Sequence, residues 1–147
     1  MSAAASPGGG QVVTHRRYVP RSAAHYGGNL VDGAYLLSLF GDVATELCVR
    51  TDGDEGLFAG YEEIAFLAPV LGGDVVEVTA TLTGRGRRSR AVLFEARVLC
   101  RATPHVGPSA ATVLEPPVVV ARARGSVVVP EPAGAAHDTP REGPSNG

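Results

Sequence analysis

The sequence has no tryptophan, only four phenylalanines and four tyrosines, and only two cysteines in 147 residues. Cys48 and Cys100 stand alone in apolar surroundings, so we expect two buried free thiols of a reducing compartment rather than a disulfide framework. No Cys-x-x-Cys pair is present, and the four histidines are scattered along the chain. This pattern lacks the ligand spacing of a metal site, and none is predicted.

Long apolar runs and a strong charge of either sign are also missing. No run approaches the roughly 20 apolar residues of a membrane span. The first residues, 1–11, are small and glycine-rich without the apolar segment of a signal peptide. The formal net charge of −2 argues against a mainly electrostatic nucleic-acid binder. We therefore expect a cytoplasmic protein with neither a membrane nor a nucleic acid as partner.

What is present is sufficient for one folded domain. The apolar fraction of 44% can supply a core, and 147 residues suit a single domain. Both ends lack the apolar content needed for ordering, so 1–11 and 131–147 are predicted to be disordered tails. The folded domain is expected to cover 12–130.

The chain is organised around a glycine-rich stretch, 25–33, that leads into the apolar run Ala34–Val49. Apolar residues in this run recur every three or four positions, which predicts a long helix that is buried on a broad face. These residues are Leu36, Leu37, Phe40, Ala44, Leu47 and Cys48. Asp32 is the expected N-cap, because its carboxylate can accept hydrogen bonds from the first free N–H groups.

Five other segments have strand character, with apolar and polar residues alternating or with glycine and proline at their ends. They are Val12–Val19, Leu57–Leu67, Val75–Thr83, Ala91–Ala102 and Val118–Val129. Short turns join most of them, which favours a largely antiparallel sheet. The proline-containing stretch 103–117 is expected to be a long connection. The predicted fold is α+β, with one central helix laid on a curved five-stranded sheet.

Two carboxylates lie one turn apart in the predicted helix, at Asp42 and Glu46. Like charges at this spacing repel each other, and they cost more in an apolar helix unless a positive group meets them. They could hold a cationic ligand, face solvent, or pair with Arg122 and Arg124 of the last strand.

The element order and the run from Gly28 to Leu36 resemble the hotdog fold and its thioesterases. In those enzymes a Gly-His/Asn segment leads into a helix that carries Tyr-Leu, and the substrates are acyl thioesters of coenzyme A or acyl carrier protein. The thioesterases usually have a catalytic Asp three residues before the glycine. This sequence has His25 there, a departure that disfavours simple thioester hydrolysis.

A more specific resemblance is to the 3-aminobutyryl-CoA ammonia lyases, which are hotdog enzymes related to β-alanyl-CoA ammonia lyase. It rests on ungapped segments spread over the domain, at 25–33, 39–47, 52–58, 66–70 and 104–109. The resemblance implies reversible elimination of ammonia from a β-aminoacyl-CoA to give an enoyl-CoA such as crotonyl-CoA. It implies no cofactor other than the coenzyme A of the substrate.

Such an elimination needs a base for the proton alpha to the thioester carbonyl, donors for the enolate oxygen and a place for the ammonium group. The backbone N–H groups from Gly28 to Gly33 can supply the donors, because a helix N-terminus favours negative charge. The candidates for the catalytic groups are His25, Asp32, Asp42 and Glu46. Glu46 or Asp42 is preferred as base and amine site. Each has a structural alternative, with His25 as a loop residue and Asp32 as a cap only.

Substrate binding is expected to involve the glycine-rich loop and the one basic hairpin. His25 and Asn29 would position the substrate. The other loop candidates are Tyr26, Gly27, Gly28 and Gly33. The resemblance places the nucleotide of coenzyme A near strand ends at a subunit interface, where guanidinium groups could contact its phosphates. The hairpin candidates are Arg85, Arg87, Arg88 and Arg90, with a solvated turn that guards a sheet edge as the alternative.

One helix cannot cover both faces and edges of a five-stranded sheet. Hotdog proteins pair edge strands into a two-fold dimer with active sites between the subunits, so we expect a homodimer or a larger homo-oligomer. Two other functions stay open. One is a hotdog acyl-CoA thioesterase or enoyl-thioester hydratase, with water as nucleophile, and the other is a non-catalytic acyl-CoA binding module.

Overall fold

The computed structural model describes residues 10–131. The predicted tails, 1–11 and 131–147, lie almost wholly outside this range. The helix is α1 (Gly33–Asp52), and a 3₁₀ turn, η1 (Arg21–Ala23), precedes it. The strands are β1 (Val12–Tyr18), β2 (Ala24–Tyr26), β3 (Leu30–Val31), β4 (Leu57–Phe66), β5 (Val75–Arg85), β6 (Ser89–Ala102) and β7 (Ala111–Val128).

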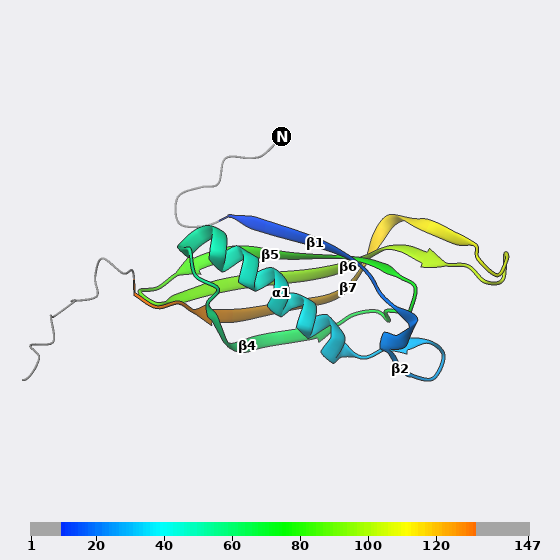
Figure 1. Ribbon diagram of the computed structural model, residues 1–147, viewed down its shortest axis with the longest axis horizontal. Coiled ribbons are helices and arrows are strands. Elements are labelled where there is room, and N and C mark those ends of the chain that lie inside the picture. The colour runs from blue at the N-terminus through cyan, green and yellow to red at the C-terminus, as the bar shows by residue number, and fades with distance from the viewer. Residues whose placement is uncertain (1–9, 132–147) are drawn as a thin grey trace, which may run out of the picture.

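Five of the strands form one sheet in the order β1-β5-β6-β7-β4, and every neighbouring pair is antiparallel. The helix α1 lies across one face of this sheet, and the short strands β2 and β3 form a separate ribbon near its N-terminal end (Figure 1). The expected single helix on a five-stranded antiparallel sheet is therefore confirmed. No helix within 10–131 is both long and apolar enough to cross a bilayer.

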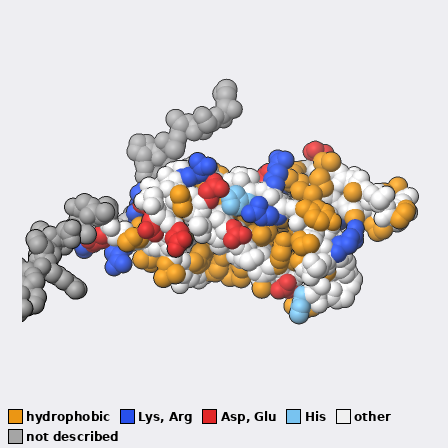
Figure 2. Space-filling view, viewed as in Figure 1, with side chains coloured by type: hydrophobic (Ala, Val, Ile, Leu, Met, Phe, Trp, Pro, Cys, Tyr) orange, Lys and Arg blue, Asp and Glu red, His pale blue; other side chains and the backbone are white. Residues whose placement is uncertain are grey.

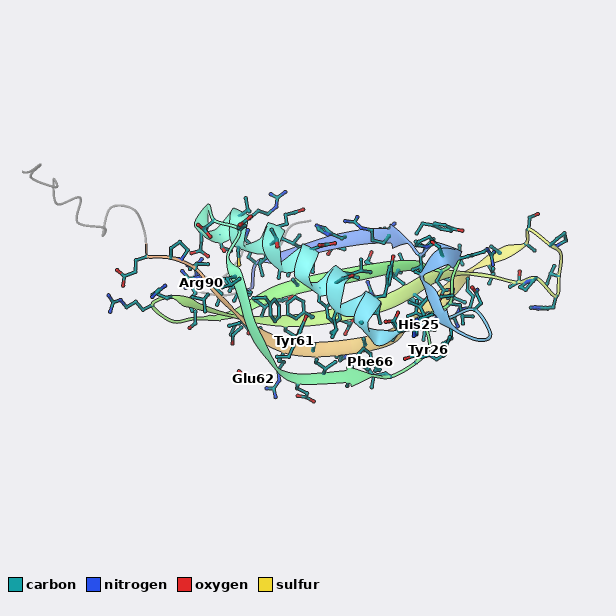
Figure 3. The ribbon with its side chains drawn as sticks, turned by 60° about the horizontal axis from the view of Figure 1, so that its bottom comes forward. His25, Tyr26, Tyr61, Glu62, Phe66 and Arg90 are labelled. Carbon is teal, nitrogen blue, oxygen red and sulfur yellow. The ribbon has the colours of Figure 1, made fainter. Side chains whose placement is uncertain are left out.

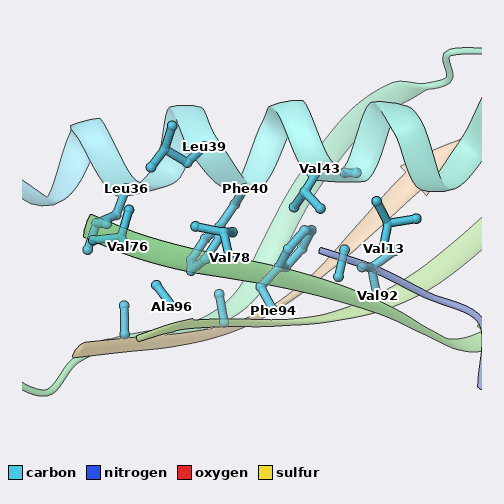
Figure 4. Close-up of a cluster of buried hydrophobic side chains, with 14 of the residues drawn as sticks. Val13, Leu36, Leu39, Phe40, Val43, Val76, Val78, Val92, Phe94 and Ala96 are labelled. Carbon is cyan, nitrogen blue, oxygen red and sulfur yellow. The ribbon is translucent and has the colours of Figure 1, made fainter. Parts of the chain in front are cut away.

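The core lies between α1 and the sheet, as the spacing of apolar residues in the helix predicts (Figure 4). Phe40 of α1 stacks on Phe94 of β6 with ring centroids 5.0 Å apart, and both side chains are fully buried. Val76 and Val78 of β5 are fully buried beside them. These aromatic and branched side chains pack α1 against the sheet and so set the position of the helix above β5 and β6.

The two ends of α1 are stabilised differently. Gly53 ends the helix in the left-handed conformation, with φ of 65°, and its N–H donates to the carbonyl of Val49 over 3.0 Å. Asp32 occupies the N-cap position with extended backbone, as predicted, but its carboxylate makes no cap hydrogen bond. The predicted side-chain cap is therefore absent. The N–H of Tyr35 donates to the backbone carbonyl of Asp32 over 3.3 Å, and the N–H groups of Gly33 and Ala34 are left free.

The strand β7 begins earlier than the sequence suggested, at Ala111 rather than Val118. Residues 111–113 continue the ladder with the end of β6, after a register shift that places Cys100 opposite Val113. Pro116 and Pro117 fall within this irregular part, where no ladder donor is required. The predicted long connection 103–117 is thus wrong in its second half. The end of β6 and the start of β7 form an arm, 100–113, that projects beyond the sheet (Figure 1).

The β5–β6 hairpin and the β2–β3 ribbon lie at opposite ends of the molecule (Figure 1). The hairpin lies near the C-terminal end of α1, and the ribbon and the arm lie near its N-terminal end. A 20-residue helix is about 30 Å long. A group on the hairpin is therefore separated from the start of α1 by the length of the helix within one chain.

Candidate active site

A cavity of about 350 Å³ lies between the start of α1 and the end of β4. Its lining is apolar, apart from backbone: Leu30, Val31, Gly33, Leu36, Phe66, Leu67, Ala68, Pro69 and Val70. The volume is within the range of small-molecule sites, about 300 to 1,000 Å³. No titratable side chain of the described chain lines it. The cavity therefore suits an apolar acyl group beside the backbone donors of a helix terminus.

The ring of Phe66 lies directly against Gly33, the first residue of α1. A Cβ added at Gly33 would overlap this ring. Since the carboxylate of Asp32 does not bond to the first turn, the N–H groups of Gly33 and Ala34 remain available beside the cavity. The positive end of the helix dipole adds to their affinity for an oxyanion.

Replacement of Gly33 by alanine is expected to lower kcat about tenfold, because small displacements of a binding cradle have large kinetic effects. The added methyl group must push Phe66 or the first turn aside. Helix propensity favours alanine over glycine by about 0.5 to 1 kcal/mol, so the melting temperature should not fall. A large loss of stability together with unchanged kcat would contradict this assignment.

The loop that precedes α1 is held by hydrogen bonds to residues 70–72, which directly follow the cavity wall. Asn29 has a φ of 62°, and its side-chain nitrogen donates to the carbonyl of Gly72 over 2.7 Å. The N–H of Gly72 donates back to the carbonyl of Asn29 over 3.0 Å, and the N–H of Val31 donates to the carbonyl of Val70 over 2.9 Å. One N–H of the Asn29 amide is thus committed to the loop itself, and its second N–H and its oxygen remain for a substrate contact.

A buried ion pair also holds the turn that contains Gly72. Asp74 is wholly buried, and its carboxylate accepts bonds from Arg101 over 3.0 and 2.8 Å and from the N–H of Leu71 over 2.8 Å. Arg101 also donates to the carbonyl of Pro69 over 2.9 Å. The pair therefore ties one wall of the cavity to β6.

The predicted loop candidates lie at the N-terminal end of α1. His25 and Tyr26 are exposed on β2, with ring centroids 4.8 Å apart in an edge-to-face arrangement. Figure 3 places both at the same end of the molecule as Phe66. Gly28 has a φ of 74°, and a Cβ added at Gly27 or Gly28 would meet no atom within 4 Å. The loop surface is therefore open to a ligand.

Glu46 is held by groups that the sequence did not suggest. His15 Nε2 on β1 lies 2.9 Å from one carboxylate oxygen, and Arg50 Nε donates to the other over 2.8 Å. The bond from Arg50, and then that from His15, lowers the pKa of Glu46 below its usual value. The predicted partners are wrong, because Arg122 pairs with a carboxylate of β6 and Arg124 with one of β4. Glu46 links α1 to β1.

The preferred base positions lie away from the cavity within one chain. Asp42, one turn before Glu46, is exposed on the same side of α1. At a rise of 1.5 Å per residue, Asp42 and Glu46 are about 14 and 20 Å along the helix from Gly33. Asp32 is adjacent to Gly33 in the chain and half-buried. Of the candidate catalytic groups, only Asp32 and His25 lie at the cavity end of the helix.

Arg90 of the basic hairpin has a structural role. Its buried guanidinium donates to the carboxylate of Asp52, at distances from 2.7 to 3.2 Å, and to the carbonyls of Gly86 and Ser89. The bond from Arg90 is the main cause of a lowered pKa at Asp52. A phosphate contact from Arg90 is therefore disfavoured, because most of its donors are taken by the C-terminal end of α1 and by the hairpin.

The other hairpin arginines are partly committed as well. Arg85 lies 3.5 Å from the carboxylate of Asp52, and Arg87 pairs with Glu131. Arg88 makes no ion pair within the described residues. All three are at the end of α1 opposite to the cavity, so they cannot reach it within one chain.

Sequence reasoning missed two parts of the site. Phe66 was included in the predicted strand Leu57–Leu67 and in the segment 66–70 of the family resemblance, and neither pattern indicated that its ring lies beside Gly33. The ion pair of Asp74 and Arg101 joins residues from neighbouring strands, which no local pattern reveals. Within 10–131 no group of three or more His, Cys, Asp or Glu side chains comes together to hold a metal.

Comparison with solved structures defines the class of protein. No protein-family model matches the chain. A hexameric hotdog fold thioesterase of Campylobacter jejuni aligns with a TM-score of 0.65 at 15% identity, over 79% of this chain and 80% of that chain. This likeness shows the hotdog fold.

Two ammonia lyases are similar in sequence as well. The β-alanyl-CoA:ammonia lyase from Clostridium propionicum aligns with a TM-score of 0.77 at 40% identity, over 82% of this chain and 85% of that chain. A 3-aminobutyryl-CoA ammonia lyase of Acetoanaerobium sticklandii is 54% identical over 108 residues, which cover 74% of this chain and 86% of that protein. The chain belongs to the 3-aminobutyryl-CoA ammonia lyase family, and the predicted resemblance is confirmed.

Proposed function

We propose that this protein catalyses the reversible elimination of ammonia from a β-aminoacyl-CoA of the 3-aminobutyryl-CoA type, giving an enoyl-CoA such as crotonyl-CoA. The observation that carries the proposal is the apolar cavity beside the free first turn of α1, in a chain of the ammonia lyase family. The reaction transfers a proton and breaks a carbon–nitrogen bond. It requires coenzyme A only as part of the substrate.

The start of α1 would hold the thioester carbonyl. The backbone N–H groups of Gly33 and Ala34 stabilise the oxygen as it becomes an enolate. A base removes the alpha proton, and the electron pair left on the alpha carbon forms the double bond as the carbon–nitrogen bond breaks. The ammonium group leaves as ammonia, which then takes the proton from the base and is released as ammonium. His25 suits the proton transfer, because its imidazole is exposed on β2 at the cavity end of α1. Asp32 suits the ammonium group, because its carboxylate is not used as a cap.

A second copy of the chain would complete the site. The cavity borders β4, which is an edge strand of the sheet and carries exposed apolar side chains. They are Leu57, Ile64 and Phe66, and the exposed Leu67 follows directly after the strand. Hydrophobic side chains follow the lower edge of the molecule, where β4 lies (Figure 2). An exposed apolar edge strand favours pairing with another chain, and we propose a homodimer or larger homo-oligomer that pairs along β4.

The direct test follows crotonyl-CoA in the presence of ammonia. Loss of the ultraviolet absorbance of the enoyl thioester, without release of free thiol, is the expected result. Thiol release, detected with Ellman's reagent, would indicate hydrolysis instead. If neither signal changes while crotonyl-CoA still binds, the protein is a binding module and the proposed reaction is wrong.

A further inference from the structure

The arginines of this protein differ sharply in their partners. The sequence contains no lysine, so arginine side chains supply all the permanent positive charge on side chains. Most of those within the described range pair with carboxylates. These are Arg16, Arg50, Arg85, Arg87, Arg90, Arg97, Arg101, Arg122 and Arg124. Within 10–131, Arg17, Arg21 and Arg88 have no such partner.

These three arginines differ in their surroundings. Arg17 donates to the neighbouring carbonyl of Arg16 over 3.2 Å, and Arg88 is exposed in the distal hairpin. Arg21, in η1, lines two cavities of about 180 and 470 Å³. Its guanidinium lies over Gly73, where a Cβ would be 3.3 Å from Nη2. The described structure gives this guanidinium no side-chain hydrogen bond, so its donors are available to a ligand.

The two cavities form one groove, because both are lined by Arg21, Ala102 and Pro104. At one end the groove is bounded by Gly28 and Asn29 of the loop that leads to α1. The other end lies between Tyr18 and the arm 100–113. We call this surface, from Gly28 past Arg21 to Tyr18, the Arg21 groove.

The charge and shape of the Arg21 groove favour an anionic ligand with an aromatic part. The one carboxylate on its wall, that of Asp74, is already neutralised by Arg101. This leaves Arg21 as an uncompensated positive charge, and a guanidinium fork matches phosphate oxygens. Tyr18 is 63% exposed beside it, and an exposed aromatic ring can stack on a purine base.

We propose that the Arg21 groove binds the phosphate-bearing nucleotide end of the coenzyme A thioester. This inference rests on the proposed function. Gly28 and Asn29 border the groove, whereas Leu30, Val31 and Gly33 border the acyl cavity. One extended ligand that follows this loop can therefore place its acyl group beside α1 and its phosphates at Arg21.

The Arg21 groove replaces the basic hairpin as the phosphate site. Within one chain the hairpin lies beyond the opposite end of α1, and Arg90 is engaged with Asp52 and the hairpin backbone. A hairpin from a second copy is the competing source of positive charge. Arg88 is its arginine without an ion-pair partner, so substitution of Arg88 separates the two possibilities.

The experiment measures binding of coenzyme A and of pantetheine, which lacks the nucleotide, by calorimetry on the full chain. Arg21→Gln should weaken coenzyme A binding about tenfold or more, because a charged hydrogen bond to phosphate is lost. Pantetheine binding should be unchanged. Arg17→Gln is the matched control, since it removes another unpaired arginine outside the groove, and it should leave both affinities unchanged.

Two results would overturn the inference. One is an equal loss of affinity for coenzyme A and pantetheine in Arg21→Gln. The other is a loss specific to coenzyme A in Arg88→Gln with none in Arg21→Gln, which would locate the nucleotide on the hairpin. Turnover of crotonyl-CoA is measured separately, so failure of the ammonia reaction would refute the proposed function without deciding the binding result.

Discussion

Asp32→Asn should lower kcat for ammonia elimination by about 100-fold or more, the usual size of the loss when a positioned acid or base group is removed. The side chain lies at the start of α1 and forms no cap hydrogen bond, so its charge is available to the substrate ammonium. Asparagine is itself a good N-cap, and the melting temperature should be unchanged. Steady-state kinetics with a β-aminoacyl-CoA and thermal unfolding provide the two measurements.

Three further variants test the assignment of Asp32 as the group that binds the ammonium. Glu55→Gln, in the exposed turn after α1, removes a carboxylate distant from the cavity and is the charge control. Asp42→Asn and Glu46→Gln test the rival base positions on the β1 side of the helix. If either of these abolishes elimination while Asp32→Asn is nearly fully active, the assignment of Asp32 is wrong. The catalytic carboxylate would then come from the helix of another copy.

Arg101→Met should reduce the free energy of unfolding by about 3 to 5 kcal/mol, because it leaves a buried carboxylate without its counter-charge. Asp74 is wholly buried, and two of its hydrogen bonds come from Arg101. The remaining bond, from the N–H of Leu71, cannot compensate for the lost charge. Urea denaturation of the variant and of the unmodified protein measures the difference.

The matched control is Arg124→Met, which removes the same side chain from an exposed ion pair with Glu63. Such a pair contributes about 1 kcal/mol or less. The double variant Asp74→Asn with Arg101→Met should recover part of the stability, since the buried charge is then gone. If Arg101→Met is no more harmful than Arg124→Met, the pair does not hold the cavity wall.

Local periodicity was sufficient for most of the fold. The apolar spacing in Ala34–Val49 predicted α1 and its buried side, and alternation in Val75–Thr83 predicted β5. Prediction failed at Ala111–Val118, because the prolines there suggested a loop. The structure places Pro116 and Pro117 at an irregularity between β6 and β7. A bulge depends on the register of two strands, which a single segment does not encode.

The site was harder to predict than the fold, since its geometry depends on partners from distant elements. Asp32 was correctly placed at the N-cap, but whether its carboxylate caps the helix is decided by the loop geometry. Glu46 was predicted as base and amine site because of its negative charge in an apolar helix. Its partner His15, 31 residues away on β1, could not be recognised in the sequence. The basic cluster around Arg90 likewise gave no indication of the hydrogen bond to Asp52, which lies 38 residues away in the sequence.

The exposed edge of β4 has a consequence for the cell as well as for catalysis. A strand with one open edge and exposed apolar side chains, such as Leu57 and Phe66, favours aggregation while it has no partner chain, because it can pair with the edge of another sheet. Self-association along β4 would remove that hazard and link folding to abundance by mass action. Newly made chains at low copy number would then depend most on chaperones. The melting temperature would rise with protein concentration.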